Sequence, residues 1–113
     1  MINAYDFGSI IVNGKEYTKD IIIYPDGHIQ DSWWRKDGHR LSDEDLTDLI
    51  ESGPEIIIAG TGAYGLMRPE EGLKNRLQKN GIEFKSAPSG DAIKLYNELY
   101  EKKRVGACFH LTC

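Results

Sequence analysis

A run of five residues in the middle of the chain constrains the fold most strongly. Glu55-Ile56-Ile57-Ile58-Ala59 is mostly apolar and β-branched, and it lies between two turn sequences, Gly53-Pro54 and Gly60-Thr61-Gly62. A continuous apolar run with turn residues on both sides is typical of a strand that is covered on both faces. The sequence therefore predicts a sheet with an inner strand at residues 55–59 and further layers packed on it.

Helix and strand signals alternate around this run. A helix is predicted from Ser42, whose hydroxyl can cap the first turn, to the stop at Gly53-Pro54. After the run we expect, in order, a helix from Pro69 to Asn80 ended by Gly81, a strand at 82–85, a helix at about 89–103 and a strand at 105–111. This alternation predicts an α/β fold with helices packed on a sheet.

The residues before Ser42 are predicted to be antiparallel β structure followed by a loop. Asn13-Gly14 separates two strand-like runs, 10–12 and 15–17, and this pair tolerates the positive φ angles of a type I′ turn. A third strand is expected at 20–24 and a short fourth one around 28–30. Residues 31–40 show no period, so we expect an ordered loop there.

Length and charge limit the function classes. With 113 residues, the chain is expected to form a single domain, 1–113, because two cores would each be too small. Eighteen acidic against fourteen basic side chains give a net charge of −4, which argues against a nucleic-acid partner. No apolar stretch approaches the roughly 20 residues of a membrane span, so no membrane partner is expected.

The start of the chain and the cysteines favour a cytoplasmic location. Met1 to Asp6 lacks the features of a secretory signal and of an organellar transit peptide. Cys108 and Cys113 are five residues apart, so a strand holding both would point them to opposite faces, and they form no disulfide framework. We therefore expect a reducing cytoplasm.

Three stretches of the chain together resemble the Mth938-like family, also called DUF498: residues 56–62, 92–99 and 104–113. Phe7-Gly8-Ser9, the Tyr24-Pro25-Asp26-Gly27 turn and Trp33-Trp34-Arg35 extend the similarity to nearly the whole chain. The resemblance implies a three-layer fold: a mixed central sheet with helices on one side and a small β layer made of the N-terminal hairpins.

The family resemblance implies little about activity, because the family has no agreed enzymatic function. Its eukaryotic relatives include an assembly factor of mitochondrial respiratory complex I and a cytoplasmic protein linked to adipocyte differentiation. The resemblance therefore favours a binding or assembly role over catalysis. The mitochondrial role does not carry over directly, because this chain has no presequence.

Residues 60–65 match the dinucleotide-binding pattern G-x-G-x-x-G. The next helix is signalled only at Pro69 and the motif follows an antiparallel region, so we expect no NAD or FAD and no other cofactor. Two interpretations remain for Gly60, Thr61 and Gly62. They form either a tight turn that needs glycine for its backbone angles, or a crevice of exposed N–H groups that binds a small anion or a partner carboxylate together with Arg68.

Cys108 and His110 are weak catalytic candidates. They lie two residues apart in a predicted strand and so share a face, but about 6 to 7 Å is too far for a direct hydrogen bond. A buried small thiol and a hydrogen-bonded core or sheet-edge histidine are therefore expected in preference to a catalytic pair. Metal binding by these residues and Cys113 is not expected, because Cys113 faces the other way. The role of Cys113 stays open.

Trp33-Trp34-Arg35 is the strongest binding signal, because Trp and Arg dominate interface hot spots. We expect one tryptophan in the core, and the other, with Arg35, on a partner surface. The first hypothesis is thus a non-catalytic binding or assembly module with a protein partner. The alternative is a small-molecule enzyme that binds an anionic ligand beside Gly60-Thr61-Gly62. The enzyme predicts a pocket that contains Cys108 or His110, whereas the module predicts an exposed aromatic surface.

Overall fold

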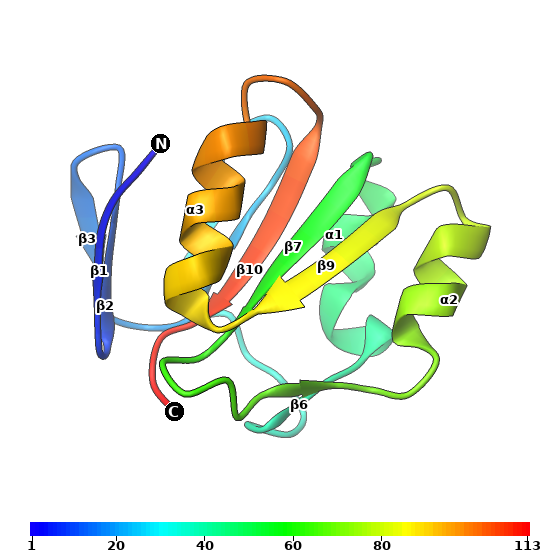
Figure 1. Ribbon diagram of the computed structural model, residues 1–113, viewed down its shortest axis with the longest axis horizontal. Helices are drawn as coiled ribbons and strands as arrows, with labels where there is room; N and C mark the ends of the chain where they lie inside the picture. Colours follow the sequence, from blue (N-terminus) through cyan, green and yellow to red (C-terminus); the bar gives the residue numbers. More distant parts are fainter.

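A five-stranded sheet lies at the centre of the computed structural model, which describes residues 1–113 (Figure 1). Its strands, in the order β5-β4-β10-β7-β9, are β5 (Ile29–Gln30), β4 (Ile21–Ile23), β10 (Val105–His110), β7 (Ile56–Thr61) and β9 (Glu83–Ala87). The last three are parallel to one another, and β4 and β5 pair antiparallel, so the sheet is mixed. Every residue of β7 is buried, which confirms the predicted inner strand.

One face of this sheet is covered by α3 (Ser89–Leu99) and by a second, three-stranded sheet. That small sheet consists of β1 (Ile2–Asp6), β2 (Ser9–Val12) and β3 (Lys15–Tyr17). Ile56, Ile58 and Phe109 from the large sheet pack here against Ala92 and Tyr96 of α3. Gly60 allows the Phe109 ring to pack closely against β7, because a Cβ at position 60 would lie 2.6 Å from that ring.

The other face carries the short helix η1 (Asp43–Leu46), α1 (Thr47–Glu51) and α2 (Leu73–Lys79). Helices therefore cover both faces, whereas the sequence-based expectation placed them on one side. Crossovers between parallel strands are right-handed. The β7–α2–β9 and β9–α3–β10 connections cross the sheet in opposite directions, so their helices lie on opposite faces.

The predicted hairpin at Asn13-Gly14 is confirmed. Both residues have positive φ angles, 50° and 82°, and Val12 lies opposite Lys15. The sequence did not predict β1, which lies at the edge of the small sheet and is largely exposed. Its start is held by Asn97 of α3, whose side chain accepts a hydrogen bond from the Ile2 N–H and donates one to the Ile2 carbonyl, both 2.9 Å long.

The helix predicted from Pro69 to Asn80 is shorter than expected at its beginning. Pro69 belongs to β8 (Arg68–Pro69), which pairs with β6 (Arg40–Leu41), and the helix starts only at Leu73. Gly72, with φ at 83°, is the N-cap and not a residue of the helix. The predicted end at Gly81 is confirmed by its φ of 76°. The last helix likewise ends at Leu99, before the predicted limit of Lys103.

The helix predicted from Ser42 begins with the single turn η1, and Ser42 is its N-cap. The Ser42 hydroxyl and the Ser42 N–H both donate to the same oxygen of the Asp45 carboxylate, each at 3.0 Å. The Asp45 carboxylate thereby closes the first turn, as an N3 carboxylate does in a capping box. This turn positions the acidic residues described below.

Candidate functional site

The loop segment Trp33 to Lys36 points its side chains alternately into and out of the protein. Trp33 is 6% exposed and Trp34 is 75% exposed. Arg35 is buried and Lys36 exposed. The Trp33 indole N–H donates to the Asp45 carbonyl at 3.1 Å, and the Arg35 guanidinium lies 4.7 Å from the centre of the Trp33 ring. The segment is thus anchored by two side chains and presents the other two to solvent.

Arg35 is held by a cluster with Asp20 and His110. Asp20 precedes β4 and His110 ends β10, and the antiparallel pairing of these strands brings the two residues together. Arg35 Nη1 and His110 Nδ1 each lie 2.7 Å from Asp20 Oδ2, and the Leu111 N–H donates to Asp20 Oδ1 at 2.9 Å. Arg35 Nη2 also donates to the Gly38 carbonyl.

The electrostatics of this cluster favour an ionised Asp20. Burial by itself would raise the pKa of Asp20, but hydrogen bonds from His110, Arg35 and the Leu111 N–H outweigh it and lower the pKa below its ordinary value. The carboxylate therefore neutralises the buried Arg35. A buried guanidinium without this partner would be costly.

The same geometry assigns the proton of His110. Nδ1 lies 2.7 Å from a carboxylate oxygen of Asp20, which only accepts, so Nδ1 carries a proton and donates it there. The contact of 3.1 Å from Arg35 Nη2 to Nδ1 then cannot be a second hydrogen bond. His110 Nε2 and Arg35 Nε are buried and have no hydrogen-bond partner in the chain. Asp20 thus orients the His110 imidazole, and the two residues together resemble a catalytic Asp–His pair.

A pocket of about 420 Å³ lies beside this anchored loop. Trp33, Trp34 and Lys36 form one wall, and Gln30 of the edge strand β5 contributes at the sheet. Glu44, Asp45, Thr47 and Asp48, from η1 and α1, form the other wall. Glu44 and Asp48 are exposed and form no ion pair, so their charges are free to meet a partner.

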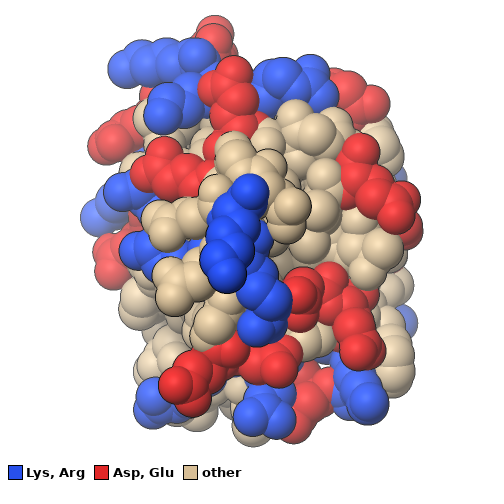
Figure 2. All heavy atoms as spheres, turned by 90° about the vertical axis from the view of Figure 1, so that its right-hand side faces the viewer, with Lys and Arg blue, Asp and Glu red and all other residues tan.

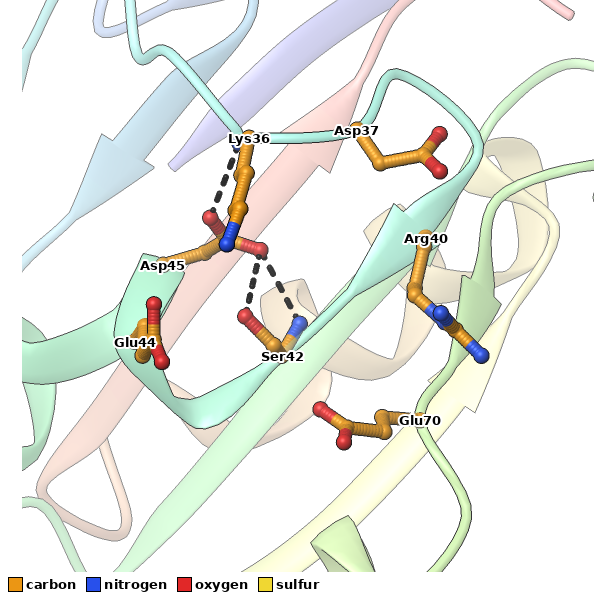
Figure 3. Close-up of a pocket in the computed structure, with 7 residues that line it drawn as sticks. All are labelled: Lys36, Asp37, Arg40, Ser42, Glu44, Asp45 and Glu70. Atoms are coloured by element: carbon orange, nitrogen blue, oxygen red, sulfur yellow. Dashed lines mark hydrogen bonds between the residues drawn. The ribbon is translucent and has the colours of Figure 1, made fainter.

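A second hollow of about 370 Å³ adjoins the first and shares Lys36, Glu44 and Asp45 with it. Arg40 and Glu70 lie across from these residues, and no apolar side chain lines the hollow (Figure 3). The Asp45 carboxylate, between the two hollows, accepts hydrogen bonds from the Lys36 N–H and from Ser42 (Figure 3). Asp45 is therefore a structural support, and Glu44 and Asp48 remain the free acidic groups.

The glycine turn at Gly60-Thr61-Gly62 is filled by the chain itself. The Gly62 N–H donates to the Ser89 hydroxyl at 2.9 Å, and the Ala63 N–H donates to the Thr112 carbonyl at 3.1 Å. The N–H groups of Tyr64 and Leu66 both donate to the backbone oxygen of Cys113. The exposed N–H groups expected there are thus already occupied.

The expected crevice beside this turn is therefore not formed. None of the pockets is lined by Gly60, Thr61, Gly62 or Arg68. Arg68 is exposed and lies in β8, whose partner is β6. Positive φ angles of 104° and 69° at Gly62 and Gly65 fit the interpretation as a tight turn.

The two weak catalytic candidates, Cys108 and His110, lie on the face of the sheet that carries α1 and α2, but they line no pocket. Cys108 is fully buried between β4 and β7, and burial raises its pKa to about 12, so the thiolate is not available at neutral pH. His110 is held by Asp20 as described. Cys113 is a free, partly exposed thiol.

Three residues of the site were missed by the sequence analysis. Asp20 is a single acid at the start of a strand, and its partners His110 and Arg35 are distant in sequence, so no local signal marks it. Glu44 and Asp48 lie at the start of the helical segment, where acidic residues are expected to complement the helix dipole. Only their position opposite Trp34 gives them a second role.

Comparisons with known proteins identify relatives of the whole chain. A family model described as "Protein of unknown function (DUF498/DUF598)" matches residues 2–110. The "13 kDa major membrane protein" of Francisella tularensis subsp. holarctica (strain LVS) is 29% identical over 104 residues, which are 92% of this chain and 84% of that protein. In the present structure, none of the helices has both the length and the apolar character needed to cross a bilayer.

Two solved structures are similar over their full length. The conserved hypothetical protein PH1505 from Pyrococcus horikoshii OT3 has a TM-score of 0.85 and 31% identity, covering 100% of this chain and 99% of that one. The protein MT938 has a TM-score of 0.82 and 32% identity, covering 100% and 98% of the two chains. Neither name states an activity.

Proposed function

The chain belongs to the DUF498/DUF598 family. We propose that it is a non-catalytic binding module of the assembly-factor type, which docks a cationic segment of a protein partner in the pocket of about 420 Å³ lined by Trp34, the Trp34 pocket. Its similarity to MT938 confirms the Mth938-like resemblance and the fold. The family description assigns no activity, so the proposal depends on the pocket itself.

The observation that carries the proposal is the exposure of Trp34 in an anchored loop. Trp34 is 75% exposed, although its neighbours Trp33 and Arg35 are buried and hydrogen-bonded. The backbone that carries the indole is therefore already held beside the pocket, which lowers the ordering cost of binding and suits an interface hot spot. Of the three residues proposed as a partner surface, only Trp34 offers a free face, and Trp33 and Arg35 position it.

The charge of the pocket selects the partner. Glu44 and Asp48 are unpaired, and Lys36 is the one cation in the wall. An Arg or Lys side chain can place its charge between these carboxylates and against the Trp34 ring, which attracts cations through its π system. A volume of about 420 Å³ suits one or two side chains of such a segment and not a folded domain.

The catalytic alternative has one observation in its favour, the oriented His110 imidazole with its unpartnered Nε2. Three observations weigh against it. The glycine turn is filled by Ser89 and by the backbone of Thr112 and Cys113, and the Cys108 thiol is buried with a raised pKa. A general base also needs access to substrate, and no pocket reaches His110.

A cytoplasmic location is part of this proposal. Cys108 and Cys113 are both free thiols, which fits a reducing compartment. The word membrane in the name of the Francisella relative describes that protein. Fractionation of source cells, followed by immunoblotting of the soluble and membrane fractions, tests the location, and recovery in the washed membrane fraction would contradict it.

The function is tested by capture from source cells with a photo-crosslinking amino acid at position 47, which is exposed and lines the pocket while leaving Trp34 in place. We expect a partner whose cross-linked segment contains Arg or Lys, and capture should be lost in the double variant Glu44→Gln, Asp48→Asn. Phe7 is 57% exposed and lines a different pocket, so a crosslinker at position 7 is the matched control. Equal capture by the double variant would show that the pocket charges do not recognise the partner.

A further inference from the structure

An exposed apolar surface lies where the turn between β1 and β2 meets the loop after β7, at the lower left of Figure 1. It consists of Phe7, Tyr64 and Leu66, of which Tyr64 is 74% exposed, and the ring centres of Phe7 and Tyr64 are 6.3 Å apart. Three of the five exposed large apolar side chains of the protein thus gather at one place. The opposite end of the molecule, which carries α2, instead shows basic and acidic side chains interspersed (Figure 2). A grouping of exposed apolar side chains marks a contact surface.

The backbone beneath these side chains is already held in place by residues 111–113. The N–H groups of Tyr64 and Leu66 both donate to the backbone oxygen of Cys113. The Gly8 N–H, next to Phe7, donates to the Leu111 carbonyl at 2.9 Å. Both parts of the apolar surface are therefore fixed to the same segment, which lowers the ordering cost of an association through it.

A hollow of about 400 Å³ adjoins Phe7 on the small sheet. Four of its seven lining residues are apolar, and its charged groups are Asp6 and Glu16, neither of which forms an ion pair. Lys15, the one cation of β3, lies on the other face of that strand, because its ammonium group lies over the ring of the buried Tyr17. The hollow therefore suits an apolar side chain that is accompanied by a cation.

Such a cation, Arg68, lies at the other end of the apolar surface. The chain runs from the loop after β7 away from the small sheet and towards β6 (Figure 1). Met67 is buried, so Leu66 and Arg68 on either side of it point outward. Arg68 forms no ion pair, and its neighbour across the β6–β8 pair is another arginine, Arg40. The surface thus runs from two free acids, through apolar side chains, to a free cation.

We propose that this surface binds a second copy of the chain in a symmetric dimer. A surface with acids at one end and a cation at the other is complementary to itself after a rotation of 180°. Leu66 of one copy then enters the hollow beside Phe7 of the other copy, and Arg68 meets Asp6 and Glu16. Three apolar side chains from each copy make a small contact, so the dimer is weak and reversible.

This surface is separate from the Trp34 pocket. No residue lines both that pocket and the hollow beside Phe7, and none of the three apolar residues lines the Trp34 pocket. The dimer therefore does not depend on the proposed binding of a protein partner, and each of the two proposals can fail without the other.

Sedimentation velocity of the full chain at about 10 μM to 1 mM tests the dimer, because this range covers the dissociation constants of weak association. We expect the average mass to rise with concentration from that of one chain towards that of two. Leu66→Ser should raise the dissociation constant by about tenfold or more. The matched control is Trp34→Ser, which removes an exposed apolar side chain outside this surface and should leave the dissociation constant unchanged.

Charge reversal separates the proposed pairing from nonspecific apolar association. The double variant Asp6→Lys, Glu16→Lys and the single variant Arg68→Glu should each stay monomeric, because like charges then face one another across the contact. An equimolar mixture of the two should form a heterodimer, since both charged contacts of the symmetric pair become attractive again. A fold defect in either variant could not be repaired by mixing.

Four results would overturn the proposal. The first three are the mass of a single chain at every concentration, loss of association in Trp34→Ser, and failure of the mixed variants to associate. The fourth is co-sedimentation of the monomer with vesicles of phosphatidylcholine and phosphatidylglycerol that is lost in Leu66→Ser, which would assign the apolar surface to a lipid bilayer.

Discussion

Asp20 and His110 are 90 residues apart in sequence and share a hydrogen bond of 2.7 Å at the end of the central sheet. The same Asp20 oxygen binds Arg35 at 2.7 Å, so a single carboxylate connects β4, β10 and the loop that carries Trp34. The aromatic pocket is therefore supported by a buried charge cluster. Changes in this cluster should therefore be visible at the pocket.

Asp20→Asn should destabilise the protein at neutral pH. The substitution keeps the size of the side chain but leaves the Arg35 charge, which is 5% exposed, without its counter-ion. We expect a loss of about 3 kcal/mol in the free energy of unfolding. Urea denaturation followed by circular dichroism measures it. A matched control is Asp31→Asn, an exposed acid of the neighbouring loop, which should change the free energy of unfolding by less than about 0.5 kcal/mol.

The acid dependence of stability should also change in Asp20→Asn. The folded pKa of Asp20 is lowered from 3.8, so its contribution is present above the unfolded pKa and is lost as the pH falls through the folded one. The unchanged protein should therefore lose stability below about pH 4, and the variant should show a shallower loss there. Parallel slopes for the two proteins in acid would mean that Asp20 is not stabilised as an anion.

The sequence predicted the elements whose signals are local. The apolar run at 55–59 and the Asn13-Gly14 turn each specify their structure within a few residues, and both were correct. Pro69 was misassigned because a proline suits the first turn of a helix as well as the end of a two-residue strand such as β8. Pairing of β8 with β6, a tertiary contact, decided between the two.

The candidate site could be predicted only in part. Trp34 was found because its residue type marks interfaces. Which of the two tryptophans is buried depends on Arg35, whose orientation is set by Asp20, and Asp20 is in turn held by the distant His110. The filling of the glycine turn by residues 112 and 113 also depends on a long-range contact. Sequence patterns report backbone angles well, but not which groups occupy a turn.

The two tryptophans should differ in fluorescence. Trp33→Phe leaves the exposed Trp34 as the only tryptophan, and its emission should be red-shifted and readily quenched by acrylamide. Trp34→Phe leaves the buried Trp33, with blue-shifted and protected emission. Arg35→Met should release the loop and make the Trp33 emission of a Trp34→Phe background more accessible to the quencher. Unchanged quenching in that double variant would show that Arg35 does not hold the loop.

Gly62→Ala should destabilise the protein strongly. Gly62 has φ at 104°, and a Cβ there would overlap the backbone oxygen of Thr112. The three atoms nearest to this Cβ belong to the backbone of Thr112 and Cys113 and cannot rotate away, so we expect a loss of more than about 2 kcal/mol in the free energy of unfolding. Gly38→Ala is the control, because a Cβ at Gly38 meets no atom within 4 Å. Similar melting temperatures for the two variants would contradict the close packing of the turn against residues 112 and 113.

The two thiols should react at very different rates with a disulfide reagent such as Ellman's reagent. Cys113 is partly exposed, whereas Cys108 is fully buried and its pKa is raised to about 12 by burial. Since the thiolate is the reactive form, one thiol should be titrated rapidly in the folded protein and the second only after unfolding in denaturant. Cys113→Ser should abolish the rapid phase, and Cys108→Ser should leave it unchanged. Rapid reaction of Cys108 in folded Cys113→Ser would show that the thiol is accessible, and the catalytic alternative would then regain its nucleophile beside the oriented His110.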